Sequence, residues 1–123
     1  MTLDKTVPVA VLREEVREFI TARDWDQFHP PKDLVIGLIT EASELLALFR
    51  FRSEAEVETL LADEAFSESV RHELADCLYF ILAISNKLDI DLVQALRDKM
   101  VLSASRYPIH LAAGRNVKYT DLP

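Results

Sequence analysis

Two pairs of acidic side chains interrupt the most apolar stretches of this chain, and the members of each pair stand three residues apart. The pairs are Glu41 with Glu44, inside residues 34–49, and Glu73 with Asp76, directly before residues 77–84. Because a helix turns once every 3.6 residues, each pair presents both carboxylates on one face. Anions in apolar surroundings need protons, basic partners or a hard divalent cation. Oxygen-only ligands favour Mg²⁺ or Mn²⁺ over Zn²⁺.

The sequence predicts an all-α protein with a single domain over residues 1–123. Half of its 123 residues are hydrophobic, only two are glycine, and the Asn-Gly and Asp-Gly pairs typical of β-hairpins are missing. We expect a compact bundle of four to five helices followed by an irregular tail. The helices are expected at about 9–24, 32–49, 70–88 and 92–105. A shorter helix is expected from the Ser53 capping box to about Ala62, and together with residues 63–69 it forms a connector between the two helices that carry the acidic pairs.

The charge distribution and the apolar runs exclude several kinds of partner. The formal net charge is −7, and the acidic surplus lies before residue 97, whereas residues 97–123 are basic. An acidic surface repels a phosphate backbone, so we expect no nucleic-acid partner. The longest apolar run, Cys77–Ile84, is far shorter than the ~18 residues of a membrane span, and we expect no membrane partner. The sequence has one cysteine, and its first residues lack the basic and then apolar pattern of a signal peptide. It therefore favours a cytoplasmic location.

Two further regions carry groups suited to binding a small ligand. The segment from Trp25 to His29, followed by two prolines, is a loop rich in aromatic and hydrogen-bonding side chains. Basic residues late in the chain, Lys99 and Arg106 among them, could hold phosphates beside a cation on the acidic helices. The helices around the carboxylates are also apolar on more faces than a lone small bundle can cover. We therefore expect a homodimer or a homotetramer.

Several motifs together resemble the MazG-like all-α nucleoside triphosphate pyrophosphatases, in particular their dCTP pyrophosphatase branch. These motifs are Arg23-Asp24-Trp25-Asp26-Gln27-Phe28-His29, Glu41-x-x-Glu44, Glu73-Leu74-Ala75-Asp76, Lys99-Met100 and Arg106-Tyr107-Pro108. The resemblance covers about residues 12–123. It implies Mg²⁺-dependent cleavage of a deoxynucleoside triphosphate between the α- and β-phosphates, which releases the monophosphate and pyrophosphate. It further implies assembly as a dimer or a dimer of dimers.

The resemblance also implies roles for individual residues. Glu41, Glu44, Glu73 and Asp76 match the metal ligands; Lys99, Arg106 and Tyr107 match positions that face the phosphates; Trp25 and His29 match the segment that holds the base, often from a neighbouring subunit. The branch commonly has Asn where Asp33 stands and Trp where Phe51 stands. These two differences bear on base selection, for which dCTP or a modified dCTP is expected.

Two other classes of protein stay open on the residues alone. A dinuclear-metal carboxylate bundle also buries acids between helices, but it needs Glu-x-x-His motifs, and neither acidic pair has a histidine at the fourth position. A non-catalytic helical interaction module would pair the acids with Arg or Lys and bind no metal. Metal-dependent release of pyrophosphate distinguishes the enzyme from this module.

Overall fold

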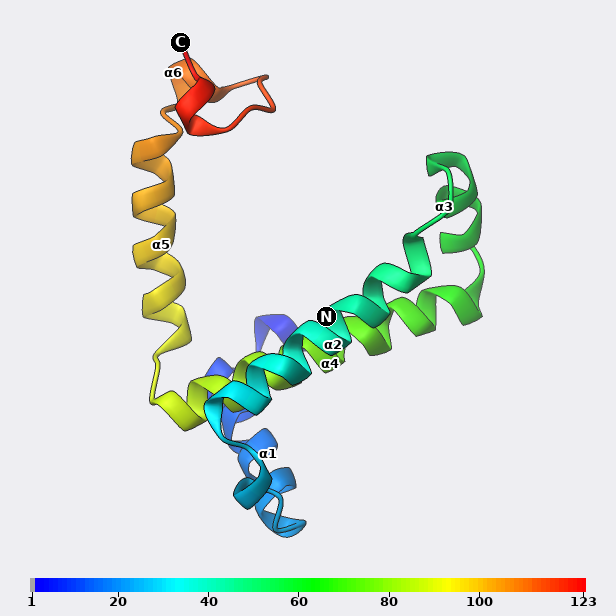
Figure 1. The fold of residues 1–123 in the computed structure, drawn as a ribbon, viewed down its shortest axis with the longest axis vertical. Helices are drawn as coiled ribbons and strands as arrows, with labels where there is room; N and C mark the ends of the chain where they lie inside the picture. Colours follow the sequence, from blue (N-terminus) through cyan, green and yellow to red (C-terminus); the bar gives the residue numbers. More distant parts are fainter. Residues whose placement is uncertain (1) are drawn as a thin grey trace. The chain divides into compact units, whose positions relative to one another are not determined.

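The computed structural model describes residues 2–123, which form six α-helices and three short 3₁₀-helices without a β-strand (Figure 1). The α-helices are α1 (Val9–Ala22), α2 (Pro31–Phe49), α3 (Glu54–Leu61), α4 (Glu64–Leu88), α5 (Leu92–Arg106) and α6 (Ile109–Ala112). The 3₁₀-helices are η1 (Leu3–Lys5), η2 (Asp26–Phe28) and η3 (Tyr119–Asp121). The predicted all-α fold is confirmed. The helices form two compact units, of which the first ends at Asp89 and the second comprises Ile90–Pro123; a single domain therefore stays a prediction.

Local signals in the sequence set most of the helix ends. Pro31 occupies the first turn of α2, where its missing N–H leaves no intrahelical bond unmade. Ser53 and Glu56 form the expected capping box at the start of α3. The side chain of Asp91 accepts a hydrogen bond of 2.9 Å from the backbone N–H of Gln94 and so caps α5. Each of these caps satisfies backbone N–H groups that the helix itself leaves unpaired.

The expected start of a helix at Val70 is wrong, because α4 already begins at Glu64. Asp63 caps this helix by accepting a hydrogen bond of 3.4 Å from the backbone N–H of Phe66. Phe66 is buried and its ring meets that of Phe49, with centroids 5.9 Å apart. Packing between α2 and α4 thus accompanies the helical conformation of residues 64–69. The tail also contains one regular element, the single turn α6.

In the first unit α4 is the central helix, and it packs against α1, α2 and α3. Helices α2 and α4 lie side by side and run antiparallel: Phe49 meets Phe66 near one end, and Gly37 meets Phe80 toward the other (Figure 1). The core beside this second contact consists of Ile20, Leu34 and Ala83, one residue from each of α1, α2 and α4. The pairing brings the middle of α2, which carries Glu41, against the part of α4 that carries Glu73 and Asp76.

The second unit consists of α5, α6 and η3. Tyr107 ends α5 and packs edge-on against Tyr119, with ring centroids 5.9 Å apart. The guanidinium of Arg106 lies 5.0 Å from the centre of the same Tyr119 ring. Within residues 2–123, none of the helices is both long enough and apolar enough to cross a membrane.

Candidate functional site

Three of the four acidic residues singled out in the sequence converge where α2 meets α4. One oxygen atom each of Glu41, Glu73 and Asp76 lies within 4.8 Å of the others. Glu41 and Glu73 are half-buried and Asp76 is exposed, so the group opens toward solvent on one side. Glu44 is exposed one turn further along α2 and is not part of this group. The helical spacing therefore places both acids of α4, but only the first acid of α2, at the point of convergence.

The clustered charges and partial burial change the acidity of Glu41. Burial raises the pKa of the Glu41 carboxyl, and the neighbouring carboxylates of Asp76, Glu73 and Glu44 raise it further. Both causes act in the same direction, because removal from water and nearby negative charge each disfavour the ionised form. A bound cation would act in the opposite direction, because a nearby positive charge lowers the pKa of a carboxyl.

The donor set fits a hard divalent cation. All three groups are carboxylates, and one oxygen of Glu73, Oε2, is buried without a hydrogen-bond partner in the part of the chain that the structure describes. A buried carboxylate oxygen with no donor is unfavourable. A cation between the three carboxylates would supply the missing partner, and oxygen ligands of this kind suit Mg²⁺ or Mn²⁺.

A cavity of about 320 Å³ adjoins the carboxylates, with Asp76 in its wall. The other lining residues are Phe19, Trp25, His29, Tyr79 and Phe80. The ring of Phe19 meets those of Trp25 and Tyr79 edge-on, with centroids 5.8 and 6.0 Å apart. An aromatic cavity with a histidine and a carboxylate in its wall suits a flat, polar-edged ring such as a nucleobase.

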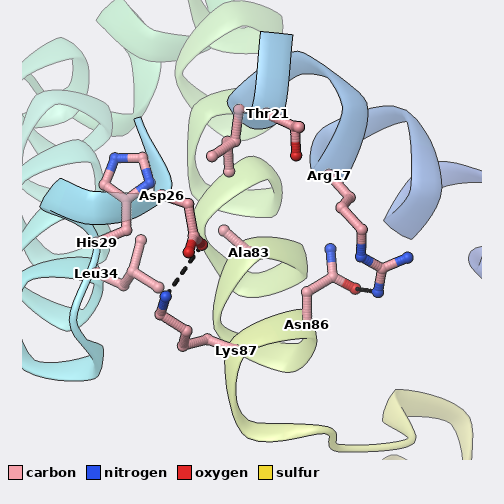
Figure 2. Close-up of a pocket in the computed structure, with 9 residues that line it drawn as sticks. Arg17, Thr21, Asp26, His29, Leu34, Ala83, Asn86 and Lys87 are labelled. Carbon is pink, nitrogen blue, oxygen red and sulfur yellow. Dashed lines mark hydrogen bonds and ion pairs between the residues drawn. The ribbon is translucent and has the colours of Figure 1, made fainter. Parts of the chain in front are cut away.

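The segment that supplies Trp25 and His29 is held against α4 by an ion pair. Figure 2 shows Lys87 of α4 reaching Asp26 of η2, and their Nζ and Oδ1 atoms are 3.0 Å apart. A second cavity of about 340 Å³ lies around this pair, and the buried core residues Ile20, Leu34 and Ala83 are among those that line it. His29 lines both cavities, and its Nδ1 atom is buried without a hydrogen-bond partner among residues 2–123.

Asp33 and Phe51, two further residues expected in the site, do not line the aromatic cavity. Asp33 is exposed in the first turn of α2. Phe51 follows α2 with 91% of its surface exposed and a backbone φ of 63°, a left-handed conformation that is costly for a bulky residue. Lys99, Arg106 and Tyr107 belong to the second unit, on α5 and at its end. Their roles stay predictions.

Phe19, Tyr79, Phe80 and Lys87 were not expected in the site. Tyr79 and Phe80 follow Asp76 by three and four residues, so the same spacing rule that paired the acids also predicts them on the face of Asp76. In the sequence they stand out only as members of a long apolar run. Phe19 and Lys87 carry no such local signal, because α1 and the end of α4 meet the loop only after folding.

Comparison with known proteins identifies relatives of this chain. No protein-family model matches the chain. Curated proteins named dCTP pyrophosphatase 1 do match over 106 residues, or 86% of the chain, with identities of 39% for the rat protein and 36% for the human protein. The chain spans only about 62% of the length of these relatives.

A solved structure matches over more of its own length. A pyrophosphatase from Archaeoglobus fulgidus superposes with a TM-score of 0.75 and 31% sequence identity, covering 80% of this chain and 91% of the archaeal chain. The fold, the sequence identity and the convergent carboxylates all point to the same family. This chain belongs to the MazG-like all-α pyrophosphatase family and has dCTP pyrophosphatases among its relatives.

Proposed function

We propose that this chain hydrolyses a deoxynucleoside triphosphate, dCTP or a modified dCTP, to the monophosphate and pyrophosphate. The observation that carries the proposal is the convergence of Glu41, Glu73 and Asp76 at the rim of an aromatic cavity that includes Asp76 itself. Such a site can hold the phosphates and the base of one nucleotide at the same time. The names of the relatives agree with this chemistry.

Glu41, Glu73 and Asp76 would hold Mg²⁺, or Mn²⁺ in its place. When bound, such a cation neutralises charge on the triphosphate and makes nearby water more acidic. The buried, unpartnered oxygen of Glu73 supports this assignment. Lys99, Arg106 and Tyr107 are proposed to contact the phosphates, as the family resemblance implies.

Glu44 is proposed to accept the proton of the attacking water. It lies three residues from Glu41 on α2 but outside the group of three, so its carboxylate stays available as a base. Water loses this proton to Glu44 as its oxygen bonds to the α-phosphorus. The bond from that phosphorus to the bridging oxygen breaks, and pyrophosphate leaves.

The aromatic cavity is proposed to select the base. Every triphosphate offers the same charges to the acidic site, so discrimination must come from groups around the ring. Trp25 and His29 line the cavity, and Asp33 and Phe51 are proposed to complete it, in a homodimer or homotetramer whose active sites lie at or near the subunit interfaces. Replacing Trp25 or His29 by Ala should raise KM and reduce the differences among nucleotides, since one stacking contact is worth about 1–3 kcal/mol.

The decisive experiment measures monophosphate and pyrophosphate release from a panel of nucleotides with Mg²⁺, Mn²⁺ or EDTA. We expect activity on dCTP or a 5-substituted relative that EDTA abolishes. Glu73→Gln and Asp76→Gln should lose both activity and metal binding, whereas Glu44→Gln should lose turnover but keep metal affinity. Glu58→Gln, an exposed acid on α3, is the matched control. Undiminished turnover in EDTA or in Glu73→Gln would refute the proposal, and inactivity of the wild type toward every nucleotide would favour the interaction module.

A further inference from the structure

Gly37 on α2 leaves room for the ring of Phe80 on α4. A methyl group added at Gly37 would lie 2.3 Å from Cε1, 2.6 Å from Cζ and 2.8 Å from Cδ1 of that ring. Carbon atoms that are not bonded do not approach so closely. The Phe80 ring can occupy this position only because residue 37 has no side chain.

Gly37 is also out of place by the rules of helix formation. Glycine destabilises a helix interior relative to alanine because it loses more backbone entropy on folding, and Gly37 stands in the middle of α2. The other glycine of the chain, Gly114, adopts a φ of 73°, which by itself favours glycine. Gly37 has no such backbone reason. Its contact with Phe80 is the reason that the structure supplies.

The Phe80 ring cannot simply move aside. It meets the ring of Tyr79 edge-on, with centroids 5.1 Å apart, and it packs against the core of Ile20, Leu34 and Ala83. On its remaining side Phe80 lines the aromatic cavity beside Asp76. A side chain at position 37 would therefore push the ring toward the cavity or toward Tyr79, which lines the same cavity.

We propose that Gly37 is a positioning residue for base selection: by admitting the Phe80 ring against α2, it sets the room left for the base in the aromatic cavity. The inference rests on the proposed function and names the contact that adjusts its specificity. Gly37 itself does not line the cavity and acts only through Phe80. The combined side-chain volume at positions 37 and 80 should most affect the binding of bases that carry a substituent, such as a methyl group at carbon 5 of a pyrimidine.

The test uses two variants whose effects should be opposite. Gly37→Ala narrows the cavity and should lower kcat/KM for 5-methyl-dCTP about tenfold more than for dCTP, chiefly through KM, as expected for one misplaced methyl group. Phe80→Leu widens the cavity and should raise kcat/KM for 5-methyl-dCTP relative to kcat/KM for dCTP. The double variant should restore the wild-type ratio to within about twofold, because the smaller side chain removes the clash. Ala47→Gly, an exposed position on α2, controls for helix propensity.

A second readout is independent of hydrolysis. Trp25 is the only tryptophan of the chain and lines the cavity, so its fluorescence can be titrated with dCMP and 5-methyl-dCMP in EDTA. We expect Gly37→Ala to lower the affinity for 5-methyl-dCMP relative to dCMP, and Phe80→Leu to raise it. A folded Gly37→Ala variant with the wild-type ratio, or a double variant that fails to restore it, would overturn the inference. A wild type that binds both monophosphates but cleaves no triphosphate would overturn the proposed function alone; one that binds neither overturns both.

Discussion

Glu41 is the residue at which charge and burial act together. Its half-buried carboxyl faces the two acids of α4, and each of these influences favours the protonated form. The folded protein without a cation thus binds a proton at Glu41 more tightly than the unfolded chain does. The same carboxyl must be ionised to bind a cation, so protons and metal compete for one group.

This competition predicts how stability depends on pH. The pKa of Glu41 is raised above its ordinary value of 4.5, so the protonated carboxyl stabilises the folded state relative to the ionised one. This stabilisation is fully present below the ordinary value and is lost as the pH rises through the raised pKa. In EDTA, Glu41→Gln should therefore be more stable than the wild type at neutral pH, with the difference shrinking below the ordinary pKa. Thermal unfolding across this range measures the effect.

Added Mg²⁺ provides the second arm of that measurement. It should raise the Tm of the wild type at neutral pH and have less effect on Glu41→Gln, which has lost one of the three charged ligands. A wild-type Tm that is insensitive to Mg²⁺ at neutral pH would contradict the assignment of Glu41. So would a Glu41→Gln variant less stable than the wild type in EDTA.

Contacts between elements position the loop that carries Trp25 and His29. Lys87 ties η2 to α4. Two arginines of α1 donate hydrogen bonds to Asn86 of α4. Nε of Arg13 and an Nη of Arg17 each lie 3.0 Å from the Asn86 Oδ1 atom. The Asn86 amide in turn donates to the backbone carbonyl of Arg13 at 2.9 Å. These bonds fix α1 and the loop against the end of α4 and so shape one wall of the aromatic cavity.

Removing the Lys87 contact should affect binding more than folding. The Asp26 carboxylate is largely exposed, and exposed ion pairs contribute at most about 1 kcal/mol to stability. We expect Lys87→Met to leave the Tm nearly unchanged but to raise KM for the nucleotide, because Trp25 and His29 lose a fixed position. Lys5→Met, at an exposed lysine of η1, is the control. High salt screens the ion pair and should therefore raise the KM of the wild type as well. An unchanged KM in Lys87→Met would contradict this role.

The first unit, taken by itself, leaves several large apolar side chains of α2 and α4 exposed. On α2, Val35, Ile36, Ile39 and Leu46 are 47–62% exposed, and on α4 Leu74 and Leu78 are 58% and 45% exposed. Large apolar side chains that stay exposed on two packed helices are typical of protein–protein interfaces. The expected homodimer or homotetramer would cover these faces with a second copy of α2 and α4.

Association can be tested with one charged substitution. Ile39→Lys should shift the protein toward monomer in light scattering and lower its activity, since a charge at the centre of an apolar interface is costly to bury. Val11→Lys, on the exposed side of α1, should change neither property. A wild type that is a stable and active monomer across the concentration range would refute the expectation.

Features that depend on neighbouring residues could be predicted from the sequence. The caps at Ser53 and Asp91 form as expected, because they need only a side chain and a backbone N–H three residues away. The acidic pairs share helix faces because 3.6 residues complete a turn. The resemblance of short motifs extended this reading to a family, which the comparisons support.

Features that depend on which faces meet could not be predicted in this way. The position of α4 against α2 selects Glu41 and leaves Glu44 outside the group of three, although both acids lie on one helix. Phe19 reaches the aromatic cavity only because α1 packs on α4, and the clash that makes Gly37 necessary involves a residue 43 positions away. Periodicity tells which side chains share a face. The partner of that face depends on the burial of apolar surface summed over the folded chain.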